Sequence, residues 1–306
     1  EFFCANMTVE MDNTDKLKVL YQDARNMGLE FEPPDVNRSG YRFEPVSNTV
    51  IRYGLGAIKG TGEGAIAAIV ATREAGGPYT SLFDFCARVD RSRLNKRTVE
   101  ALIKAGAFDS LHLNRAALLA SIDLAFDYAL AQEANANQGG LFDLMDDGHG
   151  SSTQEPELVA VTPWDIRERL QQEKTALGFH LSGHLFDANA QEVRRLVPTA
   201  LANLRDSRET QWFAGIVSDL RFINGHRGKL ALFKLDDGST TLEASADESV
   251  FAGSALLKED ALLIAQGRAQ TDRFSNELRL NLHNLIDLPT ARCRYGKHLL
   301  VQIGPL

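Results

Sequence analysis

The chain has 306 residues, of which 44% are hydrophobic and 24% charged, with a formal net charge of −8. This length suits about two domains, and no apolar run approaches the roughly 20 residues that a membrane-spanning helix needs. The start, Glu1-Phe2-Phe3-Cys4, has neither a basic signal region nor an initiating Met, so we expect a cytoplasmic fragment without membrane contact. Cys4, Cys86 and Cys293 lie far apart without CxxC spacing, which argues against zinc and against a disulfide framework.

Charge is distributed unevenly along the chain. Residues 88–104 hold six Lys or Arg and two Asp or Glu, a local charge of +4, whereas residues 143–157 hold five acidic residues and no Lys or Arg. The acidic tract suggests a two-metal site, but its linker composition cannot hold metals rigidly, so we expect no metal. The basic run indicates a DNA contact or an ordinary solvated helix face; its candidates for DNA binding are Arg91, Arg93, Lys96 and Arg97.

The most informative stretch is Leu55-Gly56-Ala57-Ile58-Lys59-Gly60-Thr61-Gly62-Glu63-Gly64-Ala65-Ile66. Glycines at 60 and 62 permit a tight hairpin with φ > 0, and the Ala/Ile-rich helix that follows begins with free backbone N–H groups that bind anions. This pattern is typical of a helix-hairpin-helix motif, which contacts the DNA backbone and reads no bases. The alternative is a plain Gly-rich turn. The candidate phosphate-binding residues are Lys59, Gly60, Thr61, Gly62 and Gly64.

A second, degenerate hairpin is expected at Lys104–Leu111, where Gly106 stands at the first glycine position and Phe108 replaces the second glycine. Its role is either DNA contact or structural support. From Asn114 the apolar spacing predicts one long helix that ends near residues 134–137. Residues 138–163 then have linker composition.

An adjacent Leu-Phe pair stands in this polar, Gly-rich segment, Gln138-Gly139-Gly140-Leu141-Phe142. Core packing explains it poorly, so we interpret it as a short linear motif that docks in an apolar pocket of a partner. The alternative is that Leu141 and Phe142 fold back onto the long helix.

From Gln211 the hydrophobic period changes to two, and the chain shows five strand patterns with a short helix between the third and the fourth. That order is the OB-fold plan. OB barrels bind single strands by stacking and charge, and the candidates here are Phe222, Arg227 and Lys229. The sheet is not strongly basic, so we expect at most weak single-strand binding.

The opening MDNTDK…ARNMGLEFEPPDVN, followed by the hairpin, resembles the end of the fingers region of bacterial C-family replicative DNA polymerases, and the resemblance continues almost to the end of the chain. It implies the C-terminal part of the polymerase III α subunit, a DNA-directed DNA polymerase. The catalytic palm and its two Mg²⁺ ions would lie outside this chain, so we name no catalytic residue and no cofactor within it. QxxLF resembles the peptide that binds the β sliding clamp, with Gln138 on the pocket rim and Leu141 and Phe142 inside.

The sequence thus predicts an α+β multidomain chain: an all-α tandem helix-hairpin-helix domain followed by a five-stranded β-barrel OB-fold. The implied partners are double-stranded DNA, single-stranded template, the clamp and other replicase holoenzyme subunits. Alternatives are an error-prone paralogue of the α subunit, a ligase-like repair protein, whose KxDG lysine and zinc cluster are absent, or a non-enzymatic adaptor in DNA repair. The expected segments are 1–50 (end of fingers), 51–134 (tandem hairpins), 135–163 (linker with the clamp motif), 164–208 (helical connector), 209–290 (OB-fold) and 291–306 (start of a further domain).

Overall fold

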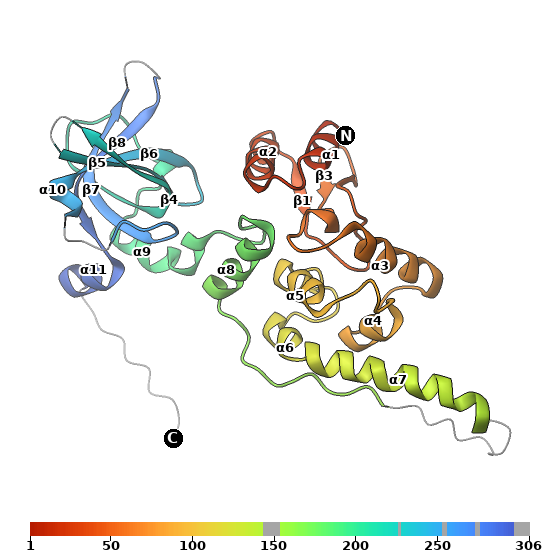
Figure 1. Ribbon diagram of the computed structural model, residues 1–306. Coiled ribbons are helices and arrows are strands. Elements are labelled where there is room, and N and C mark those ends of the chain that lie inside the picture. Colours follow the sequence, from red (N-terminus) through yellow and green to blue (C-terminus); the bar gives the residue numbers. More distant parts are fainter. Residues whose placement is uncertain (143–153, 226–227, 253–255, 273–275, 297–306) are drawn as a thin grey trace, which may run out of the picture. The chain divides into compact units, whose positions relative to one another are not determined.

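The computed structural model describes residues 1–142, 154–225, 228–252, 256–272 and 276–296. The chain forms two compact units: Glu1–Ser182, called here the N-terminal unit, and Gly183–Leu306, called the barrel unit. Figure 1 shows that helices dominate the first unit and strands the second. The expected connector, residues 164–208, is therefore divided between the two units rather than standing apart.

The N-terminal unit begins with two helices and a small sheet. Asn13 caps the second helix by accepting a hydrogen bond from Lys16 N at 3.1 Å. Three short strands follow in the spatial order β1-β3-β2, with β1 parallel and β2 antiparallel to β3. These elements are α1 (Phe2–Val9), α2 (Thr14–Asn26), β1 (Glu30–Glu32), β2 (Glu44–Pro45) and β3 (Val50–Arg52).

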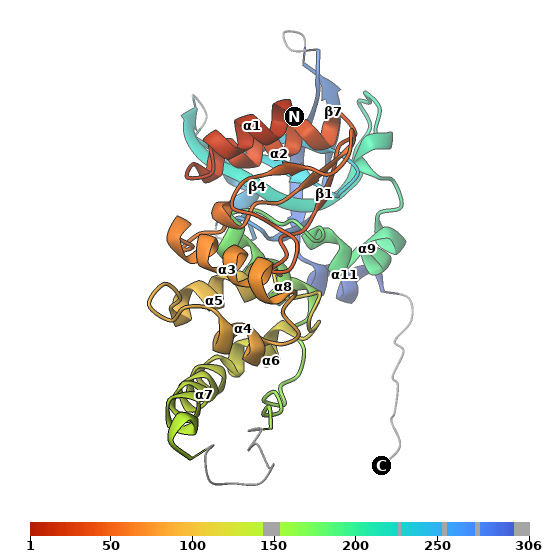
Figure 2. The same cartoon turned by 90° about the vertical axis from the view of Figure 1, so that its right-hand side faces the viewer.

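The helical part of this unit follows directly. In both views α5 and α4 lie between α3 and α7 (Figures 1 and 2). One buried cluster runs from Met7 through Ile66 and Phe108 to Phe179, so the expected boundary at residue 50 does not separate two cores. The elements are η1 (Leu55–Ala57), α3 (Glu63–Gly76), α4 (Leu82–Arg88), α5 (Lys96–Ala105), α6 (Arg115–Ala120), α7 (Ile122–Phe142) and α8 (Ile166–Leu177).

The long helix predicted from Asn114 is instead two helices. Asn114 caps α6 as expected, accepting from Ala117 N at 3.2 Å. The chain breaks at Ser121, whose side-chain hydroxyl donates to Ala117 O and whose Oγ accepts from Val159 N. A serine that bonds the preceding turn favours such a bend. Helix α7 then continues to Phe142, beyond its expected end.

The barrel unit contains the predicted OB-fold. Its strands close in the order β4-β5-β6-β8-β7, with β6 parallel to β8 and the remaining pairs antiparallel. The first strand carries a bulge between Ser218 and Arg221, where Asp219 has φ +54°. The barrel strands are β4 (Gln211–Gly225), β5 (Gly228–Asp236), β6 (Thr241–Asp247), β7 (Leu262–Thr271) and β8 (Leu278–Ile286).

Short helices complete this unit. The predicted helix between the third and fourth strands is present as α10. At the end of the described chain Ala291 is fully buried, and Arg292 forms a bidentate ion pair with Glu192 at 2.6 Å. The further domain expected to start at residue 291 stays a prediction. The helices are η2 (Leu185–Ala188), α9 (Ala190–Leu196), η3 (Leu201–Asn203), α10 (Glu248–Phe251) and α11 (Leu288–Tyr295).

Candidate nucleic-acid interface

The predicted hairpin lies between η1 and α3. Gly60 adopts the left-handed conformation with φ +85°, which a residue with a side chain adopts only under strain. The hydroxyl of Thr61 lies 2.9 Å from Leu55 O and 2.7 Å from Ile58 O, so its side chain supports the hairpin from within. Lys59 N donates to Ala176 O of α8 at 2.8 Å. The Gly-x-Gly sequence therefore forms the rigid turn that its spacing predicts.

The start of α3 leaves backbone donors free. Ala65 N and Ile66 N bond to Gly62 O, but within the part of the chain that the structure describes the N–H groups of Gly62, Glu63 and Gly64 donate to no acceptor. No atom lies within 4 Å of the position that a Cβ would take on Gly62. An anion therefore has open access to these N–H groups and to the positive end of the helix.

The basic run reaches this hairpin through Arg93 and the start of α5. Arg93 Nη1 lies 3.5 Å from the position that a Cβ would take on Gly64, and Thr98 Oγ1 lies 3.5 Å from Gly60 O. Arg93 and Arg97 are exposed, and among the described residues neither forms an ion pair. Arg93 thus lies beside the turn that carries the free N–H groups, and Arg97 follows in the first turn of α5. The free N–H groups, Arg93 and Arg97 are together called here the hairpin surface.

Two other cations of the run form ion pairs in this structure, and their predicted contact with DNA stays a prediction. Arg91 Nη1 pairs with Glu133 at 3.1 Å, and Lys96 Nζ pairs with Asp123; both carboxylates belong to α7. The hydrogen bond to Asp123 raises the pKa of Lys96. Sequence reasoning missed Asp123 and Glu133, because 27 and 42 residues separate them from their partners.

The second hairpin packs against charged side chains from α6 and α8. Arg115, whose side chain is 3% exposed, forms ion pairs with Asp109 at 2.6 Å and with Glu173 at 3.2 Å. Burial disfavours the guanidinium charge, but the two carboxylates outweigh it and raise the pKa of Arg115. Phe108 is fully buried. The Arg115 guanidinium fills the space that a Cβ on Gly106 would occupy. This contact supports a structural role for the second hairpin over a DNA-contact role.

The clamp-motif residues lie on a helix, contrary to the predicted loop. Gln138, Leu141 and Phe142 fall in the last turns of α7. The glycines at 139 and 140 therefore do not end the helix as their composition suggested. The acidic tract at 143–153 lies outside the described residues.

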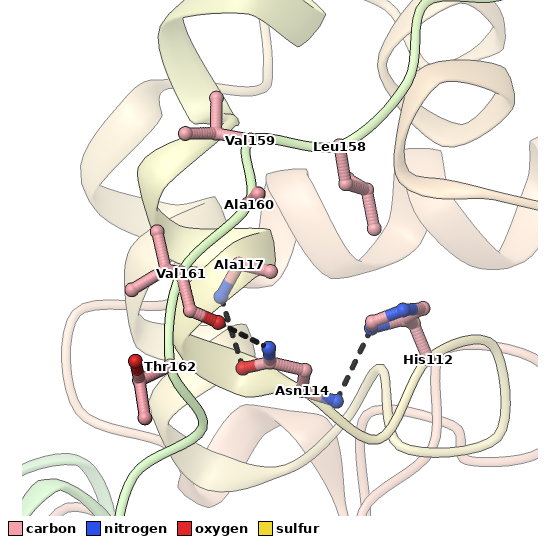
Figure 3. A pocket seen from close by; sticks show the side chains of 8 residues that line it. All are labelled: His112, Asn114, Ala117, Leu158, Val159, Ala160, Val161 and Thr162. Carbon is pink, nitrogen blue, oxygen red and sulfur yellow. Dashed lines mark hydrogen bonds between the residues drawn. The ribbon is translucent and has the colours of Figure 1, made fainter. Parts of the chain in front are cut away.

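The segment that follows this tract is fixed against the N-terminal unit. The side-chain amide of Asn114 donates to Val161 O at 2.8 Å while its carbonyl caps α6 (Figure 3). A surface pocket lies here between His112 and Leu158–Thr162. Residues 157–163 are thus not the free linker that their composition suggested.

The barrel offers only a limited single-strand surface. Phe222 is 54% exposed and packs on Phe251 with a ring separation of 5.5 Å. Lys229 is exposed, whereas Arg227 lies outside the described residues. Two other barrel cations are already paired: Lys234 with Asp219 at 2.8 Å, and Arg279 with Glu243 at 2.9 Å and Asp272 at 2.8 Å.

Two further features bear on function. Across the described residues, no group of three or more His, Cys, Asp or Glu side chains is arranged to hold a metal ion. Among the same residues, every helix is too short or too polar to cross a bilayer.

Comparison with known proteins agrees with this geometry. A family model described as the helix-hairpin-helix motif matches residues 28–118. A DNA polymerase III subunit alpha of Neisseria meningitidis serogroup B is 46% identical over 316 residues, covering 100% of this chain and 26% of the relative. The same-named proteins of Pseudomonas aeruginosa and Escherichia coli K12 are 39% and 36% identical, and each match covers 99% of this chain and 27% of the relative.

Over nearly its whole length the chain is similar to the DNA polymerase III α subunits of these bacteria. It spans about a quarter of the length of these relatives. The helix-hairpin-helix prediction and the resemblance to C-family polymerases are both confirmed.

The similarity to solved structures is partial and low. The second OB-fold domain of replication protein A from Methanococcus maripaludis is 12% identical, with a TM-score of 0.24, and the match covers 29% of this chain and 93% of that domain. A small single-stranded DNA-binding protein from Streptomyces coelicolor is 16% identical, with a TM-score of 0.24, covering 28% of this chain and 98% of that protein. The OB-fold assignment itself rests on the strand order.

Proposed function

We propose that this chain is the C-terminal, DNA-holding and clamp-tethering part of a DNA polymerase III α subunit. Nucleotide transfer and its Mg²⁺ ions would belong to the palm of the full-length protein, outside this chain. Homology over the whole chain supports the assignment. The observation that carries the DNA-holding role is the group of free N–H donors at the start of α3 beside Arg93 and Arg97.

The hairpin surface is suited to the phosphates of duplex DNA. Free N–H groups and the helix dipole attract an anion, and exposed guanidinium groups add charge. Contacts of this kind position the protein without reading sequence. Glu63 lies in the first turn of α3, where its carboxylate also interacts with the dipole, so the surface should hold duplex DNA moderately rather than tightly.

Replacing Arg93 and Arg97 together by alanine should weaken duplex binding roughly 10- to 100-fold near 0.1 M salt and reduce the salt slope by about 1.8, because two phosphate contacts are lost. Gly62→Val should also weaken binding, since a side chain would stand where phosphate approaches. Gly62 has φ −89° and open space around it, so valine fits. Fluorescence anisotropy of a labelled duplex, measured across a salt series, gives both quantities.

The matched control is Lys18→Ala with Arg25→Ala, which removes two exposed cations from α2. This pair should change affinity much less than the Arg93/Arg97 pair. Equal losses in the two double variants would mean that only net charge matters, and the hairpin surface would have no special role.

We further propose that the end of α7 binds the β sliding clamp through Gln138, Leu141 and Phe142, and that the barrel contacts single-stranded template weakly through Phe222 and Lys229. The exposed ring of Phe222 suits base stacking. The paired state of Lys234 and Arg279 keeps the electrostatic contribution small. Other replicase subunits would contact parts of the protein outside this chain.

A further inference from the structure

Helix α7 places carboxylates against the basic run that leads to the hairpin surface. Asp123 pairs with Lys96 near the start of α7, and Glu133 pairs with Arg91 about ten residues later. The run has four cations within residues 91–97, so these pairs occupy half of them. The other two, Arg93 and Arg97, form no ion pair among the described residues.

These pairs lie in water. The side chains of Asp123 and Glu133 are 80% and 64% exposed, and those of Lys96 and Arg91 are 53% and 34% exposed. Exposed ion pairs contribute little to stability and exchange readily with other charges. A DNA phosphate can therefore replace either carboxylate at its cation.

Lys96 has further neighbours on α7. Its ammonium lies 5.7 Å from the centre of the Phe126 ring of the same helix. Asp127, one turn beyond Asp123, also raises the pKa of Lys96. Lys96 thus lies against acidic residues of α7, and a DNA phosphate must displace them to bind it.

We propose that Asp123 and Glu133 are built-in competitors of DNA phosphate at Lys96 and Arg91. They limit the number of phosphates that the basic run engages and so keep the duplex exchangeable. This inference rests on the proposed binding of duplex DNA at the hairpin surface. It makes α7 a regulator of that surface as well as the carrier of the clamp motif.

The test is Asp123→Asn combined with Glu133→Gln, assayed by anisotropy with the same labelled duplex. Two freed cations should steepen the salt slope by about 1.8. The gain in affinity over the unsubstituted chain should therefore be about tenfold larger at 50 mM salt than at 200 mM. Adding Arg91→Gln and Lys96→Gln should abolish this gain, because it arises through these two side chains.

The matched control is Glu155→Gln with Glu157→Gln, which removes the same charge from two exposed side chains that form no ion pair among the described residues. It should leave the salt slope unchanged. If the Asp123/Glu133 variant has an unchanged or shallower slope while the unsubstituted chain binds duplex, the competitor inference is wrong. If the unsubstituted chain does not bind duplex, the proposed DNA-holding role is wrong, and so is the inference that rests on it.

Discussion

Replacing Glu173 by alanine should destabilise the N-terminal unit by about 3–5 kcal/mol, because it leaves a buried guanidinium without one of its partners. The Glu173 side chain is 1% exposed. Its carboxylate accepts from Arg115 at 3.2 Å and from the backbone N–H groups of Leu181 and Ser182 at 2.8 Å each. One side chain thus joins α8, the second hairpin and the end of the unit.

Urea unfolding followed by circular dichroism at 222 nm measures this effect. The matched control is Glu168→Ala, an exposed glutamate on the same helix, which should cost no more than about 0.5 kcal/mol. Removing both charges, by Glu173→Leu with Arg115→Leu, should restore part of the loss, since a buried pair is often replaceable by apolar packing. A Glu173→Ala variant as stable as the control would show that the pair is dispensable.

The double substitution Leu141→Ala with Phe142→Ala should reduce clamp affinity at least 100-fold. Burying each of these side chains in a partner pocket contributes about 1.5–3 kcal/mol, and every 1.4 kcal/mol corresponds to a factor of about ten. Since a peptide at a helix end loses ordering entropy on docking, the affinity of the intact motif should be modest, near micromolar. Titration calorimetry with the purified clamp measures the loss.

Leu130→Ala provides a matched control, because Leu130 is a 46% exposed leucine on the same helix. It should leave clamp binding intact. The free energy of unfolding of the double variant should lie within about 0.5 kcal/mol of that of the unsubstituted chain. The double variant should also bind duplex DNA normally. A large fall in melting temperature would instead show that Leu141 and Phe142 pack within the chain itself. The reason to propose that they bind a partner would then be lost.

Local signals in the sequence were enough for the turns and the barrel. The spacing of Gly60 and Gly62 predicts a tight hairpin, because φ > 0 is a property of the residue itself. Period-two alternation predicts the five strands, and the side chains of Asn95 and Asn114 cap helices α5 and α6 through residues three positions away. These features depend on neighbours within a few residues.

The sequence does not predict the ion pairs between residues that lie far apart along the chain. Arg91 and Lys96 were assigned to DNA, but nothing near them in sequence indicates that α7 brings Glu133 and Asp123 alongside. The sequence predicts that residues 164–208, which include α8, form a connector. In the structure Glu173 of α8 accepts a hydrogen bond from Arg115, which is 58 residues away in sequence. Helix α7 passes the glycines at 139 and 140, because a single glycine weakens a helix by only about 1 kcal/mol.

The backbone amides of Gly62, Glu63 and Gly64 test the central claim most directly. We expect their ¹H–¹⁵N chemical shifts to move when a short DNA duplex is titrated into the full chain, and to return when salt is raised. The amides of Ala65 and Ile66, which already bond to Gly62 O, should move less. Duplex binding that leaves the shifts of Gly62, Glu63 and Gly64 unchanged would contradict phosphate binding by the hairpin.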